Sequence, residues 1–305
     1  MMTVVTNLVA QVVLYTTVYA LVVLGIIIGG RAGIFNISGE GIMLLSASTG
    51  YMAAISTQNW LIGFVVGAFA GGCLGLILIL IHEKLKVDQF ILGICLFILG
   101  SALADLFYKI MFAAKVRVQR APLIPHISVP LLSKIPIIGG FFDQNALTFF
   151  MYLSVFATYW FFYKTKKGID VRAIGESPKA ADVVGINVRG YRILATVVGA
   201  VLMGLGGAYL PMAVTGSYSY QMTAGRGFMA IGIAIFANWK PQRVFVSSFV
   251  FAIFEVFAPQ LQLLFPKMPF QFFLMLPFVG ILVIMAIFKK NIEFPAALGD
   301  PYSRE

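Results

Sequence analysis

Charged residues are scarce in this chain. Asp, Glu, Lys and Arg make up only 11% of its 305 residues, whereas 60% are hydrophobic, and the mean hydropathy is +0.94. A soluble domain of ordinary composition contains roughly 25% charged residues. The composition therefore excludes a soluble globular protein and predicts a protein whose surface faces lipid.

Residues that bind metals or form disulfides are also rare. The chain has two cysteines and two histidines. Cys73 and Cys95 both fall inside apolar runs, where a free cysteine packs as a small hydrophobic residue. His82 and His126 are far apart in the sequence and lack the spacing of zinc or haem ligands. We therefore expect no metal site and no cofactor bound by this chain.

Motifs for catalysis and for nucleotide binding are missing as well. No GxxxxGK[ST] sequence occurs, so ATP is not expected to bind here. A membrane-embedded enzyme would need an HExxH, a paired-Asp motif or a Ser/His arrangement, and none is present. The net charge of +10 does not indicate a nucleic-acid partner, because Lys and Arg in the loops of membrane proteins set topology. We therefore predict no catalytic residue.

Long apolar runs dominate what the sequence does contain. A helix of about 20 apolar residues crosses a bilayer, and such runs recur along the chain. We predict an all-α, polytopic transmembrane bundle that forms a single domain over residues 1–305. The first run lacks a basic flank and a cleavage site, so it is expected to remain as an anchor. The expected segments number about nine, with a range of eight to ten: 7–28, 41–57, 60–81, 90–108, 146–163, 191–211, 226–238, 243–265 and 270–288.

The distribution of Lys and Arg orients these segments. With the N-terminus outside and the C-terminus inside, more than twice as many basic residues lie in the cytoplasm as outside, as the positive-inside rule requires. This orientation makes 164–190 a cytoplasmic loop and 289–305 a cytoplasmic tail. It makes 109–145 an extracytoplasmic loop, although that loop is itself basic. Four prolines in this loop argue against a long helix.

Glycines and polar residues interrupt the apolar pattern after residue 28. The stretch "GGRAGIFNISGEGIMLLSA" ends one apolar run and begins another. Breaks between membrane segments expose polar groups and often line transport sites. An ordinary turn with a Ser-Gly-Glu helix start explains the same residues equally well. If the break lines a pathway, the candidates are Phe35, Asn36, Ser38 and Glu40.

Ionisable residues within the predicted spans are rare. Asp105 lies near a span end, whereas Glu255 lies near the middle of segment 243–265. A carboxylate inside a membrane is a candidate functional group by default. Three roles remain open for Glu255: lining a pathway, pairing with another helix, or being protonated. Arg226 is expected to reach the interface in a structural role, and residues 217–225 are expected to dip back into the protein.

A charged stretch, "DVRAIGESPKAADVVGINVRG", separates two apolar segments. Ser177 suits a helix N-cap and Pro178 the first helical position, and Gly185 suits the position just past the end. A helix over 178–184 would be about 10 Å long at ~1.5 Å per residue, which is too short to be stable alone. A surface loop with one helical turn is the alternative. We predict a rigid knob for a groove on another protein, with an apolar face of Ala180, Ala181 and Val184.

Five motifs in the same order resemble the permease subunits of ATP-binding-cassette (ABC) importers. The most similar subgroup is the permeases for nucleosides and simple sugars, which work with a binding protein of the basic-membrane-lipoprotein type. Ribose and branched-chain amino acid permeases are similar more broadly. The resemblance covers most of 20–55 and 165–245, plus the tail, and is thin across 60–160. The motifs are "RAGIFNISGEGIMLLSA", "VRAIGESPKAADVVGINV", "GAVLMGLGGAYL", "TAGRGFMAIGIAIFANWKP" and "PAALGDPY".

The resemblance implies a division of labour in a prokaryotic cell membrane. The permease forms half of the pathway, and a second, often distinct permease supplies the other half. A cytoplasmic ATPase binds ATP and Mg and drives transport, while an extracytoplasmic lipoprotein delivers the substrate. In this family the loop that matches "GESPKAADVVGI" is the coupling helix that docks into the ATPase. The matching residues are Glu176, Ser177, Pro178, Lys179, Ala180, Ala181, Asp182, Val184 and Gly185.

The substrate expectation depends on the resemblance alone. A purine nucleoside is the first expectation, and a simple sugar such as ribose or galactose is the alternative. An ion-coupled secondary transporter would use Glu255 or Asp105 to carry the ion, but it leaves residues 178–184 without a role. The resemblance carries over Asn36, Ser38 and Glu40 as pathway candidates only.

Overall fold

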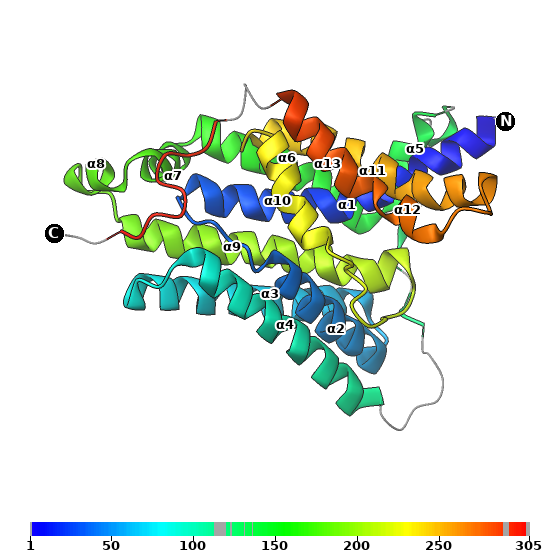
Figure 1. The fold of residues 1–305 in the computed structure, drawn as a ribbon, viewed down its shortest axis with the longest axis horizontal. Coiled ribbons are helices and arrows are strands. Elements are labelled where there is room, and N and C mark those ends of the chain that lie inside the picture. The colour runs from blue at the N-terminus through cyan, green and yellow to red at the C-terminus, as the bar shows by residue number, and fades with distance from the viewer. Residues whose placement is uncertain are drawn as a thin grey trace.

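The computed structural model is a bundle of long helices. It describes residues 2–112, 120–122, 124–130, 132–135, 137–288 and 293–302. In Figure 1 the helices lie side by side, with α8 and the C-terminus at one end of the molecule and the N-terminus at the other. The helices are α1 (Met2–Arg31), α2 (Gly39–Thr57), α3 (Trp60–Leu85), α4 (Gln89–Phe112), α5 (Gly139–Phe142), α6 (Ala146–Lys164), α7 (Lys166–Glu176), α8 (Pro178–Val183), α9 (Val188–Tyr209), α10 (Arg226–Phe236), α11 (Pro241–Leu264), α12 (Phe270–Leu274) and α13 (Leu276–Phe288).

The predicted all-α membrane bundle is confirmed. In the part of the chain that the structure describes, seven helices are long and apolar enough to cross a membrane. They make the chain a multi-pass membrane protein. Each of the nine expected segments coincides with a helix or with α12 and α13 together. Two of these helices are not among the seven, because α2 is less apolar than they are and α10 is shorter. The number of spans therefore stays a prediction. The seven helices are Val5–Arg31, Trp60–Leu85, Gln89–Met111, Ala146–Lys164, Val188–Val214, Pro241–Leu264 and Phe270–Ile287.

The core lies where α1, α2, α3 and α9 pack together, and glycines make this packing possible. A Cβ added at Gly25 of α1 would lie 2.3 Å from the carbonyl oxygen of Gly199 on α9. A Cβ at Gly207 of α9 would lie equally close, 2.3 Å, to the carbonyl oxygen of Met43 on α2. Backbones in contact at this distance leave no room for any side chain. Glycine is therefore required where α9 crosses its two neighbours.

The predicted loop 109–145 contains short elements and no long helix among its described residues. α4 extends into it as far as Phe112. The strands β1 (His126–Ser128) and β2 (Asp143–Asn145) pair antiparallel, and a 3₁₀ turn, η1 (Leu132–Lys134), and α5 lie between them. The Gln144 side-chain amide donates to the backbone oxygen of Ala10 at 3.0 Å. This subdomain therefore packs on α1 near the N-terminus.

The chain is irregular and only partly buried between α9 and α10. α9 continues into a π-helical turn, η2 (Leu210–Val214), which contains Pro211. Turns follow as far as Gly225. Tyr218 and Thr223 are buried within this stretch. Ser219, Tyr220, Gln221 and Ala224 are exposed, so the expected return of this segment into the protein stays a prediction.

The predicted coupling loop 164–190 contains two helices, and the sequence indicated only one. α7 was missed because its sequence is polar and contains two glycines. The Thr165 side chain caps α7 by accepting from the backbone N–H of Gly168 at 3.1 Å. A Cβ at Gly168 would lie 1.9 Å from the carbonyl oxygen of Phe161. Gly168 therefore lets α7 fold directly back onto the end of α6.

Candidate functional site

The short helix α8 has the local structure that its sequence predicts. Ser177 is the N-cap, and its hydroxyl accepts from the Ala180 N–H at 3.4 Å, with Pro178 in the first turn. The helix ends at Val183, one residue earlier than expected. Gly185 follows with φ +85°, a left-handed conformation that glycine adopts without strain. Capping at both ends thus fixes a helix that would be unstable in isolation.

The predicted apolar face of α8 is wrong at Ala181. Ala181 is only 3% exposed and forms a small core with Ile174 of α7 and Val188 of α9. Ala180 and Val184, which is 73% exposed, do face outward, and Val183, 88% exposed, joins them. Ala181 faces inward, and its contacts with α7 and α9 anchor α8 to the rest of the chain.

The other predicted coupling residues surround this helix. Glu176 ends α7 and lies 3.9 Å from Arg31 of α1 in an ion pair. Lys179 and Ala180 are exposed on α8, and Asp182 is half-buried. The structure therefore brings the predicted set together on a single surface, with Ala181 as its support.

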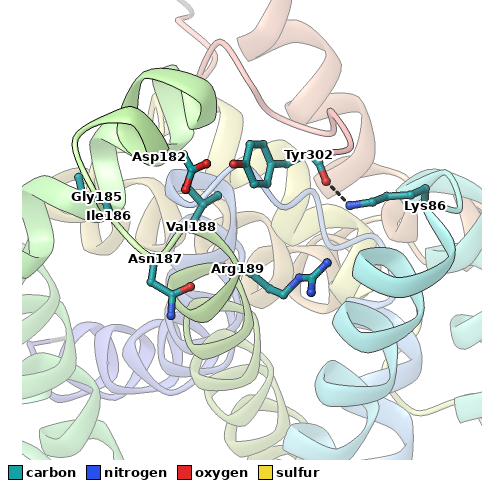
Figure 2. A pocket seen from close by; sticks show the side chains of 8 residues that line it. All are labelled: Lys86, Asp182, Gly185, Ile186, Asn187, Val188, Arg189 and Tyr302. Atoms are coloured by element: carbon teal, nitrogen blue, oxygen red, sulfur yellow. Dashed lines mark hydrogen bonds between the residues drawn. The ribbon is translucent and has the colours of Figure 1, made fainter. Parts of the chain in front are cut away.

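A groove of about 560 Å³ lies beside α8 (Figure 2). Figure 2 shows that it is bounded by the turn after α8, the start of α9, the end of α3 and the chain's C-terminal segment. Its rim carries both signs of charge, with Asp182 on one side and Lys86 and Arg189 on the other. Such a rim suits a polar protein surface more than a small apolar ligand. The lining residues are Lys86, Asp182, Gly185, Ile186, Asn187, Val188, Arg189 and Tyr302.

The C-terminal segment 293–302 forms one wall of this groove. Lys86 donates to the backbone oxygen of Tyr302, and Arg192 donates to that of Asp300 at 3.2 Å. Two backbone bonds hold its middle: Ala297 N–H to Gly175 O at 2.9 Å and Gly299 N–H to Gly33 O at 3.0 Å. The segment therefore ties α1, α3, α7 and α9 together at this end. The remaining tail residues, 289–292 and 303–305, lie outside the described residues.

A cluster of charged residues around the buried Glu83 lies next to the groove, and it was not predicted from the sequence. Glu83 is 2% exposed and Arg192 is fully buried; Arg192 Nη1 lies 3.7 Å from Glu83 Oε1. Arg189 Nε and Lys86 Nζ lie 3.4 Å and 3.8 Å from the other carboxylate oxygen. Buried charges persist only when paired. The motif "HEKLK" at the end of a span was the available signal, because a carboxylate there needs a cation.

Asn36 and Ser38 bond to each other at the break before α2. Asn36 Oδ1 accepts from the backbone N–H of Ser38 at 3.0 Å and from its hydroxyl at 2.6 Å. Phe35 is held by its backbone N–H, which donates to Gln89 Oε1 at 2.6 Å. Its ring packs edge-on against Trp239, with centroids 6.3 Å apart. These side chains therefore order the turn that leads into α2.

Glu40 lies at the N-terminus of α10. Its Oε1 accepts from the Thr223 hydroxyl at 2.6 Å and from the Gly225 N–H at 2.8 Å. Its Oε2 accepts from the Gly227 N–H at 2.6 Å. A carboxylate here satisfies unpaired N–H groups and interacts favourably with the helix dipole. Glu40 therefore connects α2 to α10 through buried hydrogen bonds.

Glu255 on α11 is paired with two other helices. It forms an ion pair with Arg226 of α10 and accepts from the Tyr19 hydroxyl of α1 at 2.7 Å. Arg226, whose side chain is 14% exposed, thus has a structural role through this ion pair, and its reach to the membrane interface stays a prediction. A cavity of about 220 Å³ lies against this pair, with Tyr15 and Phe278 also in its wall. The candidates Glu40 and Glu255 thus converge on the first turn of α10.

A known protein family matches most of this chain. A family model described as "Branched-chain amino acid transport system / permease component" matches residues 8–285. The chain belongs to this permease family. The resemblance inferred from the five motifs is therefore confirmed. No solved structure matches the chain significantly.

The permease is similar to full-length transport proteins of several prokaryotes. It is 31% identical to the nucleoside ABC transporter permease NupC of Lactococcus lactis, over 97% of this chain and 96% of that protein. It is 27% identical to the guanosine ABC transporter permease NupQ of Bacillus subtilis, over 94% of both chains. A putative glucose ABC transporter permease of Haloferax volcanii, TsgC13, is 31% identical over 78% of this chain and 73% of its own length. NupB, a second nucleoside permease of the same Lactococcus strain, is 23% identical over 75% of this chain and 66% of its own length.

Proposed function

We propose that this permease is the membrane subunit of an ABC importer for nucleosides, with purine nucleosides such as guanosine as the preferred class. The supporting observation is similarity over almost the whole chain to NupC and NupQ. The sugar permease TsgC13 matches a smaller share of both chains. Import of a simple sugar such as ribose or galactose is the second candidate.

Coupling to ATP would occur through α8. The helix presents Val183 and Val184 outward, while Ala181 anchors it to the rest of the chain. Exposed valines at the end of a capped helix suit an apolar contact with a partner protein, and the charged rim of the 560 Å³ groove suits its orientation. The partner would be a cytoplasmic ATPase that binds ATP and Mg. Residues 164–190 and the C-terminus would then lie in the cytoplasm.

The remaining partners follow from the same proposal. NupB and NupC are two different nucleoside permeases in one strain. A second, homologous permease would therefore complete the pathway as a heterodimer with this chain. An extracytoplasmic lipoprotein would deliver the substrate at the opposite end from α8.

The pathway would pass the first turn of α10. Glu40 accepts three hydrogen bonds from protein groups, and Asn36 and Ser38 bond each other, so these residues would shape the pathway. Glu255 differs because a cavity adjoins it. Its carboxylate could accept from ribose hydroxyls, which are donors of the right chemistry for a carboxylate.

Competition for uptake by the complete importer tests this function. Labelled guanosine uptake is measured in proteoliposomes that contain both permeases, the ATPase and the lipoprotein. We expect unlabelled adenosine, inosine and guanosine to compete, and ribose and galactose not to compete. No uptake of labelled guanosine, together with uptake of labelled ribose or galactose by the same proteoliposomes, would establish the second candidate. Uptake by this chain alone, driven by an imposed ion gradient, would show a secondary transporter instead.

A further inference from the structure

An apolar groove of about 440 Å³ opens between α6 and α9, at the end where α7 begins. Its wall is made of aliphatic and aromatic side chains, and Lys167 is its one charged lining residue. Leu194 and Val198 of α9 line it and are largely exposed. Both helices are long and apolar enough to cross a membrane. The groove therefore opens on the outer face of two candidate membrane-spanning helices.

The floor of the groove is part of the well-packed interior. Phe162, Val171 and Ala195 are buried in it and form a separate small core with Ala32. Gly168 brings the first turn of α7 into contact with the backbone of α6 at Phe161. α7 therefore closes one end of the groove.

Lys167 places a cation at this closed end, where α6 leaves the apolar region. Lys164 and Lys166 are exposed beside it in the sequence. The nearest acidic residue along α7 is Asp170, which accepts from the Tyr191 hydroxyl at 3.2 Å. Among the residues that the structure describes, Lys167 has no carboxylate within ion-pair distance. Its ammonium group is thus available to an anion at the level of the lipid headgroups.

We propose that this groove is a binding site for one phospholipid, with an acyl chain between α6 and α9 and the phosphate on Lys167. An apolar channel beside a basic side chain at the membrane surface matches the two parts of a phospholipid. The occupant would fill the space under α7, and α7 carries α8 directly. The lipid would therefore support the position of the coupling helix. The site requires only that the chain spans a membrane and does not depend on the substrate or on the ATPase.

Lipid retention tests this site on the intact chain. The purified permease is delipidated, titrated with phosphatidylglycerol and analysed by native mass spectrometry. We expect one tightly bound lipid in the wild type. Lys167→Gln should weaken its affinity about tenfold, as expected when one charge-assisted hydrogen bond is lost. Lys166→Gln is the matched control, because Lys166 is exposed and does not line the groove.

A second pair of variants tests the acyl-chain part independently. Ala157 lines the groove from the exposed face of α6, so Ala157→Phe should fill it and abolish the tight binding. Leu153→Phe, on the exposed part of the same helix outside the groove, should leave it unchanged. Equal lipid binding by the wild type, Lys167→Gln and Ala157→Phe would overturn the proposal. So would an Ala157→Phe variant that binds lipid normally but no longer assembles with the second permease, because the groove would then be a subunit interface.

Discussion

At the scale of single residues, α8 depends on a division between buried and exposed positions. Ala181 packs against Ile174 and Val188 inside the chain. Val183, two residues further along, is 88% exposed. Two positions on one short helix therefore have different roles, and the same substitution should cost far more stability at Ala181 than at Val183.

Ala181→Asp should destabilise the permease, because it buries a carboxylate that has no partner. We expect a loss of about 2–5 kcal/mol in the free energy of unfolding, the range for an unpaired buried charge. Val183→Asp should change stability by no more than about 0.5 kcal/mol, because the side chain is exposed. Thermal unfolding of the detergent-solubilised protein measures both. Equal melting temperatures for the two variants would contradict the assignment of Ala181 to the core.

Residue patterns in the sequence predicted the local structure of this region better than its contacts. Ser177, Pro178 and Gly185 fixed both ends of α8 because capping depends on neighbouring residues in the chain. The inward face of Ala181 depends on α7 and α9, so the sequence alone placed it wrongly. The pairing of Glu83 with Arg192 was missed for the same reason. It joins residues that are far apart in the sequence, and no local pattern indicates the partner.

At the scale of elements, α10 is the point where several helices meet. Glu40 of α2 binds its first turn, and Glu255 of α11 pairs with Arg226 on that turn. α1 joins through Tyr19. The sequence predicted Glu255 as a candidate and left its role open, because the facing residue lies on another helix. The structure shows the helix-pairing role; a role in the pathway stays a prediction.

Removing one member of the Arg226–Glu255 pair should be costly. Glu255→Gln leaves a buried guanidinium without its anion, which typically lowers the free energy of unfolding by about 3–5 kcal/mol. The double variant Arg226→Met/Glu255→Met should recover much of this loss, because it removes both charges and keeps similar volumes. Thermal unfolding of the three variants is the measurement. A double variant that is no more stable than Glu255→Gln would show that the charges do not act as a pair.

The C-terminal segment should hold the coupling region in place. Its backbone bonds to Gly175 and Gly33 tie α7 and α1 at the end of the bundle. Deletion of 293–305 should therefore raise amide exchange in residues 166–190 by about tenfold or more, while exchange in α2 stays unchanged. Hydrogen exchange followed by mass spectrometry reports both regions. Unchanged exchange in 166–190 would show that the segment only rests on this surface.

At the scale of the whole molecule, the predicted orientation has a direct test. In a variant with Cys73 and Cys95 replaced by alanine, single cysteines are introduced at Lys166 and at His126. Both positions are exposed. A membrane-impermeant thiol reagent added outside intact cells should label His126→Cys and leave Lys166→Cys unlabelled until the cells are opened. The reverse pattern would invert the topology, and labelling of both would require an even number of spans between them.

The central claim is that α8 transmits ATP hydrolysis to nucleoside movement. ATP-driven guanosine uptake by the complete importer in proteoliposomes tests it most directly, with Val183→Asp/Val184→Asp compared with the wild type. The charges should disrupt an apolar contact with the ATPase and lower uptake at least about tenfold, while thermal stability and guanosine binding by the lipoprotein stay unchanged. Wild-type uptake by this double variant, with the ATPase still bound, would contradict the claim.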